Sequence, residues 1–145
     1  RTEDAGPLCR KLEHPRLRTV FSGYHWYAVD GTELGGLLEG AAPLLSSANV
    51  CGSRRTDGPA PTVEPLDEGE LDNFAVLGGL RAVGYGGPIG VQGYSLGGDV
   101  YAYLRRSLAA LRDIEQRLDR FPQWAQLRAD PLPLASGADR DEVPA

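Results

Sequence analysis

The sequence predicts an α/β protein built on a parallel sheet. Three short runs are typical of β-strands, residues 17–22, 48–51 and 88–92, because they carry Val, Ile, Thr or Phe between turn-forming residues. A helical pattern follows each run, and the runs begin about 30 to 40 residues apart, the length of a βα unit. We expect one folded domain over residues 1–120, followed by a C-terminal extension, residues 121–145, that is largely without a fixed fold.

Apolar spacing predicts a helix before the first strand and a second helix after it. The first helix has Pro7 in its first turn and carries Leu8 and Leu12 on one face. The second begins at Asp30, which caps it while Glu33 reaches back to the cap. Its apolar face consists of Leu34, Leu37, Leu38, Ala41 and Leu45. We expect both faces to pack against the sheet.

Two further helices follow the second and third strands. The apolar face of the earlier one consists of Leu71, Phe74, Leu77, Leu80 and Val83. Gly84 is placed to end this helix in a left-handed conformation. The last helix has the clearest stripe, formed by Val100, Leu104, Leu108, Leu111, Ile114 and Leu118. Charged residues occupy its opposite side, so we expect the whole stripe to pack against the sheet.

Composition restricts the functional classes. The 145 residues are 41% hydrophobic and 24% charged, as in soluble globular proteins, and the net charge of −5 argues against nucleic-acid binding. No apolar run approaches the ~20 residues of a membrane span, and no signal peptide is recognisable. Two cysteines do not make a disulfide framework, so we expect a cytoplasmic location. Because the chain lacks methionine and begins at Arg1, we expect a processed N-terminus or a fragment of a longer protein.

Residues 93–97, Gly-Tyr-Ser-Leu-Gly, match the G-x-S-x-G nucleophile elbow of α/β-hydrolases, between a predicted strand and a predicted helix. In that fold the acid and the histidine follow the serine along the chain. Here the two histidines, His14 and His25, both precede Ser95. Without a base to take its proton, the Ser95 hydroxyl is an ordinary alcohol. A serine esterase therefore stays a less favoured alternative to a glycine-rich strand-to-helix turn.

Three segments resemble a known family. Glu68-Gly69-Glu70-Leu71-Asp72 is similar to a Gly-Glu-Gly-x-Ile/Leu-Asp segment, Gly84-Tyr85-Gly86-Gly87-Pro88-Ile89 to the turn before a last strand, and Tyr24-His25-Trp26-Tyr27 to a His-Trp pair after a strand. Over residues 2–118 the chain looks like the C-terminal part of the sugar phosphate isomerases/epimerases with a xylose isomerase-like TIM barrel.

This resemblance implies a partial (β/α)8 barrel with about three parallel strands and four helices. Five strands of the eight-stranded barrel would lie outside the chain. The outer strands would then have unpaired edges, through which the chain is expected to self-associate.

The resemblance also implies a metal centre whose usual ligands are replaced. Metal-dependent family members hold one divalent ion with Glu, Asp, His and Glu at the carboxyl ends of the last four strands. The first glutamate falls outside the chain, the aspartate falls on Ser22, the histidine on Cys51 and the final glutamate on Gln92. Hydroxyl, thiol and amide groups are poor substitutes for carboxylates around a hard cation. We therefore expect no metal cofactor and no conventional metal-assisted isomerisation by this chain alone.

A ligand pocket is nevertheless expected at the carboxyl ends of the strands, where βα folds gather their sites. Its candidate residues are His25, Trp26, Cys51, Gln92 and Tyr94. Aromatic rings beside an imidazole suit a sugar or polyol, which stacks on a ring and hydrogen-bonds to polar atoms. Two main hypotheses remain open: a fragment of an isomerase or epimerase that acts on a sugar or polyol, and a non-catalytic barrel relative that binds such a ligand.

Overall fold

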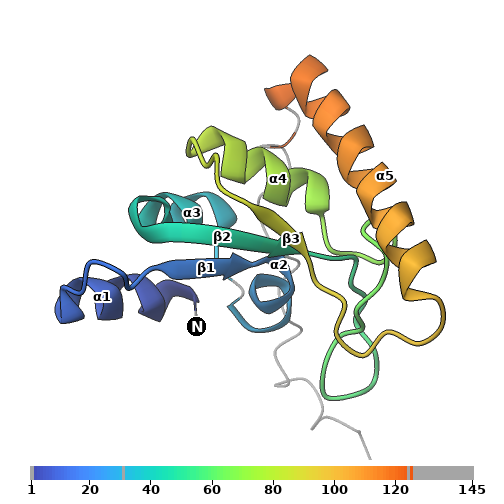
Figure 1. Ribbon diagram of the computed structural model, residues 1–145, viewed down its shortest axis with the longest axis horizontal. Coiled ribbons are helices and arrows are strands. Elements are labelled where there is room, and N and C mark those ends of the chain that lie inside the picture. The colour runs from blue at the N-terminus through green and yellow to red at the C-terminus, as the bar shows by residue number, and fades with distance from the viewer. Residues whose placement is uncertain (1, 31, 124, 126–145) are drawn as a thin grey trace, which may run out of the picture.

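The computed structural model describes residues 2–30, 32–123 and 125, which form a three-stranded parallel sheet with helices on one face (Figure 1). The strands are β1 (Thr19–Ser22), β2 (Leu45–Val50) and β3 (Ile89–Val91), in the order β1-β2-β3. Both neighbouring pairs are parallel. The α/β class and the three parallel strands predicted from the sequence are therefore confirmed.

The middle strand begins three residues earlier than its β-like run indicates. Pro43 lies in a short 3₁₀ turn, η2 (Ala42–Leu44), and the chain enters β2 directly after it at Leu45. Leu45 was expected to continue the apolar face of the preceding helix, and this expectation is wrong. Proline favours the first positions of a helical turn and cannot donate a hydrogen bond within a longer helix, so the helical segment ends there.

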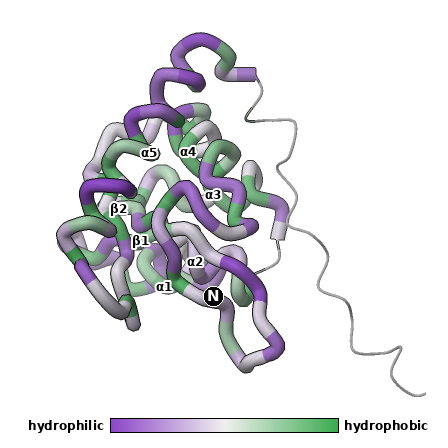
Figure 2. Tube along the Cα trace, turned by 90° about the vertical axis from the view of Figure 1, so that its right-hand side faces the viewer, coloured by the Kyte–Doolittle hydropathy of each residue, from purple (hydrophilic) through white to green (hydrophobic). Residues whose placement is uncertain are grey.

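Four longer helices accompany the sheet: α1 (Thr2–Leu12), α3 (Leu34–Ala41), α4 (Asn73–Ala82) and α5 (Val100–Arg120). A single turn, α2 (Gly23–His25), and a π-helical turn, η1 (Trp26–Asp30), connect β1 to α3. In the helical layer α4 packs between α3 and α5, as Figure 2 also shows. The number of long helices within the described residues agrees with the partial barrel expected from the family resemblance.

The hydrophobic core lies between the helices and one face of the sheet. Phe21, Ala48 and Val50 point from the strands into this core and are fully buried. The main apolar residues that meet them from the helices are Leu34, Leu38, Ala75, Val76, Leu77, Leu80, Ile114 and Leu118. On the other face of the sheet Val20 is 48% exposed, because side chains alternate between the two faces. That second face would line the inside of a closed barrel.

The first helix differs from its prediction. It begins at Thr2, so Pro7 lies in its middle rather than in its first turn. Leu8 and Leu12 are 55% and 58% exposed, while Cys9 is buried. The expected packing face was therefore wrong. The helix contacts α3 and β1 with the side that carries its small residues, which allow a closer approach than leucine would.

The second helix also begins later than expected, because Glu33 rather than Asp30 caps it. The Glu33 carboxylate accepts hydrogen bonds from the backbone N–H groups of Gly35 and Gly36, at 2.5 and 2.6 Å. The cap therefore comes directly before Leu34. The backbone of Asp30 ends the π-helical turn, and its side chain lies outside the described part of the structure.

Aspartates cap the starts of the last two helices. Asp72 accepts from the N–H of Ala75 and starts α4, and Gly84, with φ of +70°, follows its end as predicted. Asp99 caps α5 by accepting from Tyr101 and Ala102. The stripe on α5 packs only in part: Ile114 and Leu118 are buried, whereas Val100, Leu104 and Leu108 are 53%, 46% and 44% exposed.

The outer strands β1 and β3 each pair on one side only within the described residues. Of the predicted C-terminal extension, the structure describes residues 121–123 and 125, and the rest lies outside it. Within the described part of the chain, no helix combines the length and the apolar composition needed to cross a membrane.

Candidate functional site

The candidate site lies where the three strands end. Ser22 is the last residue of β1, and Cys51 and Gln92 directly follow β2 and β3. The Ser22 hydroxyl donates to the Gln92 side-chain carbonyl, Oγ to Oε1 3.4 Å. The Gln92 N–H donates to the carbonyl of Val50 at 2.8 Å, which continues the β2–β3 ladder by one residue. The side chains from the two outer strands therefore meet across the end of the middle strand.

Cys51 lies at the same end but is closed off from solvent. Its side chain is fully buried, and burial raises the pKa of its thiol to about 11. At neutral pH it is thus a protonated, weakly nucleophilic thiol. The Cys51 carbonyl accepts a hydrogen bond from the Asn73 side-chain amide at 2.8 Å. The same amide donates to the carbonyl of Leu66 at 3.1 Å, so α4 fixes the end of β2 to the loop that follows it.

Tyr103 supports the Gln92 side of the site from α5. Its hydroxyl lies 2.7 Å from the Gln92 carbonyl oxygen and 3.1 Å from that of Glu64, and its single hydrogen is shared between these two acceptors. Burial, together with the nearby Cys51, raises the pKa of Tyr103, so the phenol remains protonated and available as a donor. The sequence reasoning missed both Tyr103 and Asn73. The only local indication that Tyr103 has a buried, hydrogen-bonding role is its position next to the apolar stripe of a helix.

The aromatic segment after β1 is divided between core and surface. His25 is exposed, and its backbone N–H donates to the Ser22 hydroxyl at 3.4 Å. Its ring meets the Tyr24 ring edge-on, with ring centres 5.5 Å apart. Trp26 is 98% buried, and its indole N–H donates to the Thr32 carbonyl at 2.9 Å. The Trp26 side chain thus belongs to the core, whereas the His25 side chain lies at the surface against the Tyr24 ring.

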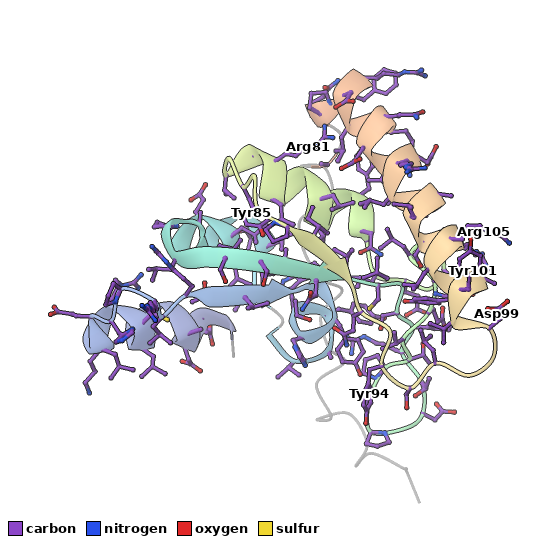
Figure 3. The ribbon with its side chains drawn as sticks, viewed as in Figure 1. Arg81, Tyr85, Tyr94, Asp99, Tyr101 and Arg105 are labelled. Carbon is purple, nitrogen blue, oxygen red and sulfur yellow. The ribbon has the colours of Figure 1, made fainter. Side chains whose placement is uncertain are left out.

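Tyr94 follows β3 in an exposed loop. It is 77% exposed, and Figure 3 shows it extending away from the sheet. The described contacts do not join it to the Ser22–Gln92 pair. Of the five candidate pocket residues, the structure therefore brings Cys51 and Gln92 to one end of the sheet, with His25 beside Ser22. It places Tyr94 on the periphery.

A polar network that the sequence did not predict holds the long loop after β2. The Tyr27 hydroxyl donates to the Glu70 carboxylate at 2.8 Å, and the Arg55 guanidinium donates to the Tyr27 carbonyl at 3.0 Å. The Arg55 guanidinium also lies 4.7 Å from the centre of the Tyr27 ring. The hydrogen bond from Tyr27 lowers the pKa of Glu70. Tyr24 donates to the carbonyl of Pro61 at 3.0 Å, so this loop is joined to the segment after β1 at several points.

The donor set at the strand ends does not fit a hard divalent cation. Ser22 and Gln92 supply neutral oxygens, and the Cys51 thiol is buried with a raised pKa. Among the described residues there is no group of three or more His, Cys, Asp or Glu side chains placed to hold a metal ion. Hard cations need several charged oxygens to replace their water shells. The residues present instead offer a neutral set of hydrogen-bond donors and acceptors.

The geometry at Ser95 differs from a nucleophile elbow. Ser95 is exposed, with φ of +60°, and β3 ends four residues before it. The following helix begins only at Val100, after the Asp99 cap. In an elbow the serine sits in the sharp turn between strand and helix, with a histidine in reach. The described contacts place no histidine on the Ser95 hydroxyl.

Known protein structures share this architecture. No protein-family model and no curated protein matches the chain. A xylose isomerase domain protein from Planctomyces limnophilus matches with a TM-score of 0.64 at 14% identity, over 83% of this chain and 43% of that one. An L-ribulose 3-epimerase matches with a TM-score of 0.63 at 14% identity, over 86% and 45%. The chain spans less than half the length of either, and it has the fold of part of a xylose isomerase-like TIM barrel.

Proposed function

We propose that the chain is a fragment of a sugar isomerase/epimerase-like barrel that binds a sugar or polyol at the carboxyl ends of its strands. The observation that carries the proposal is the Ser22–Gln92 pair, which joins the ends of β1 and β3 with neutral groups. The two similar structures are a xylose isomerase domain protein and a sugar epimerase, which supports a ligand of this class.

Neutral hydrogen-bonding groups suit neutral hydroxyl groups. The Gln92 amide has two donor hydrogens and a carbonyl acceptor, and the Ser22 hydroxyl both donates and accepts. Two adjacent hydroxyls of a polyol can therefore replace the 3.4 Å contact between these side chains with one hydrogen bond to each. The exposed side chain of His25, a residue whose backbone N–H donates to the Ser22 hydroxyl, provides a third polar contact at the rim.

The same groups do not support proton transfer at carbon. An amide does not accept a proton near neutral pH, so Gln92 is not a general base. The raised pKa of Cys51 keeps its thiol protonated at neutral pH, so it does not serve as one there. The proposal is therefore ligand binding by these residues, with isomerisation absent in the chain as it stands. The non-catalytic hypothesis from the sequence is the one that this chemistry favours.

Calorimetric titration with L-ribulose and xylitol tests the proposal. We expect binding in about the millimolar range, because a ligand held by few contacts gains little free energy beyond the cost of association. Gln92→Leu keeps the side-chain volume but removes both polar functions, and we expect it to abolish the binding heat. Gln116→Leu is the matched control, since Gln116 lies on the exposed side of α5. No heat with either probe, or the same heat in Gln92→Leu, would contradict the proposal.

A further inference from the structure

We propose that residues 126–134, which follow Ala125 directly, dock in an apolar groove that runs along α4. The groove is a cavity of about 940 Å³ between α3, α4 and the end of α5. On α4 its lining extends from Ala75 to Ala82, which is most of the helix. Ser22, Cys51 and Gln92 are not part of this lining. The groove is thus separate from the proposed ligand site, and either can exist without the other.

The groove has an apolar lining and few free charges. Its apolar residues include Leu34, Ala42, Ala75, Ala82 and Leu118. Of the three charged residues that line it within the described chain, Arg81 pairs with Asp119 of α5, and Glu33 accepts the N–H groups that cap α3. The third, Glu39, is exposed to solvent. Because a charge buried without a partner is costly, this lining favours an apolar occupant over a charged ligand.

The chain already enters this groove at Ala125. Ala125 is only 5% exposed, belongs to the hydrophobic core and lines the groove. A Cβ atom at Gly78 of α4 would lie 2.0 Å from the Ala125 Cβ, so a glycine is needed there for Ala125 to fit. Glycine inside a helix costs about 1 kcal/mol relative to alanine, and the close contact with Ala125 gives this glycine a structural reason. The chain that follows α5 is therefore in contact with α4 where residue 126 begins.

The next nine residues have the composition that such a groove requires. Residues 126–134 contain Leu127, Leu132 and Leu134, whereas residues 135–145 contain four charged residues and a single large apolar one, Val143. The apolar residues of the C-terminal extension are therefore concentrated next to the groove. The sequence led us to expect little fixed fold in this extension, because it cannot form a core of its own. The groove supplies the apolar contacts that residues 126–134 cannot provide for one another.

The length and stiffness of this segment also fit. Pro131 and Pro133 restrict φ and favour an extended backbone, which reduces the conformational entropy that is lost on docking. Nine extended residues span up to about 30 Å. A ten-residue helix such as α4 is about 15 Å long. Residues 126–134 are thus long enough to follow α4 along the whole groove.

A segment of the same chain has an advantage over a separate molecule. Because Ala125 is held in the groove, the residues that follow it are present there at an effective concentration in about the millimolar range. Pro122 and Gln123 line the groove as well. A separate peptide or a second copy of the chain must compete with this tethered segment. The occupant that the structure favours is therefore the chain's own residues 126–134.

Amide hydrogen exchange of the full chain, followed by mass spectrometry of its peptides, tests the proposal directly. We expect the amides of residues 126–134 to exchange about tenfold or more slowly than those of an unstructured peptide, whereas residues 135–145 exchange at the unstructured rate. The measurement is repeated at several protein concentrations. If residues 126–134 exchange at the unstructured rate, the groove does not hold them and the proposal is wrong. Slowing that appears only at high concentration indicates the segment of a second copy and also overturns the proposal.

A variant within the groove tests where the segment docks. Ala82 is exposed at the end of α4 and lines the groove. Ala82→Arg places a long charged side chain there, and we expect it to accelerate exchange in residues 126–134 about fivefold or more. Ala109→Arg is the matched control, because Ala109 is exposed on α5 and is not part of this lining. Circular dichroism confirms that both variants keep their helices. Exchange that Ala82→Arg leaves unchanged shows that the segment is held elsewhere and refutes the proposal.

Variants within the segment provide a second measurement that leaves the groove intact. We expect Leu127→Ser combined with Leu132→Ser to lower the urea midpoint of unfolding by about 0.5 M or more, because two leucines lose their apolar contacts. Val143→Ser is the control, since Val143 lies beyond the segment. Equal midpoints for the double variant and the wild type contradict the proposal.

Discussion

Replacing Asn73 with alanine tests how the end of β2 is held at the candidate site. The Asn73 amide is 96% buried and donates to the carbonyls of Cys51 and Leu66, at 2.8 and 3.1 Å. Both of those residues are also buried. Losing the donor to a buried carbonyl costs about 1–3 kcal/mol for each carbonyl. The side-chain oxygen of Asn73 is itself buried without a partner, so its removal returns about 1 kcal/mol. For the two carbonyls together, the net expectation is a loss of about 1–5 kcal/mol in the free energy of unfolding.

Urea unfolding followed by far-ultraviolet circular dichroism measures this loss. Asn73→Asp is the informative companion variant, because Asn73 is the first residue of α4. A carboxylate there is favoured by the helix dipole, yet it cannot donate to the two carbonyls. We expect Asn73→Asp to destabilise the chain about as much as alanine does. A loss below about 0.5 kcal/mol for alanine, or a gain in stability for aspartate, would refute the reasoning.

Three further predictions follow from the same end of the sheet. Gly52→Ala would place a Cβ atom 1.9 Å from the carbonyl oxygen of Pro65, so we expect urea unfolding to show a loss of more than about 3 kcal/mol, or failure to fold. Burial raises the pKa of Cys51 to about 11, so the folded state holds this proton more tightly than the unfolded state does. The free energy of unfolding should therefore be insensitive to this group below about pH 8 and fall by up to about 2–3 kcal/mol between pH 9 and 11; a difference between the wild type and Cys51→Ala that does not change with pH would contradict this. Ser22→Asp and Gln92→Glu combined should raise the calorimetric affinity for Mn²⁺ about tenfold or more, because they supply two carboxylates from side chains that are in contact; no gain would show that these two side chains do not converge.

The sequence indicated which segments end at the site. It did not indicate which of their side chains are buried and which are exposed. It placed Ser22, Cys51 and Gln92 at the ends of strands, because the carboxyl ends of parallel strands lie at one edge of a sheet. It grouped Cys51 with the candidate pocket residues, and the structure shows that the Cys51 side chain is fully buried. It also grouped Tyr94 with these residues, although Tyr94 lies in an exposed loop. Exposure depends on what packs over a residue, and the sequence near that residue does not contain this information.

The supporting residues illustrate the same limit. Asn73 and Tyr103 hydrogen-bond to backbone atoms of segments that are 22 and 11 residues away in the chain. No local pattern relates these pairs. Tyr27 and Glu70, which are 43 residues apart, form a contact of the same kind. Only the folded chain brings them within hydrogen-bonding distance.

The sequence by itself determined the α/β class, the parallel direction of the strands and the left-handed position of Gly84 after α4, because these depend on local periodicity and on backbone preferences. Tertiary structure decided which side of each apolar stripe became buried. On α1 and α5 a hydrophobic residue has the same local propensity whether a partner surface exists or not, so Leu8 and Leu104 look like core residues in the sequence. Their exposure follows from the limited surface that a small sheet can cover when, within the described residues, it has three strands and two unpaired edges.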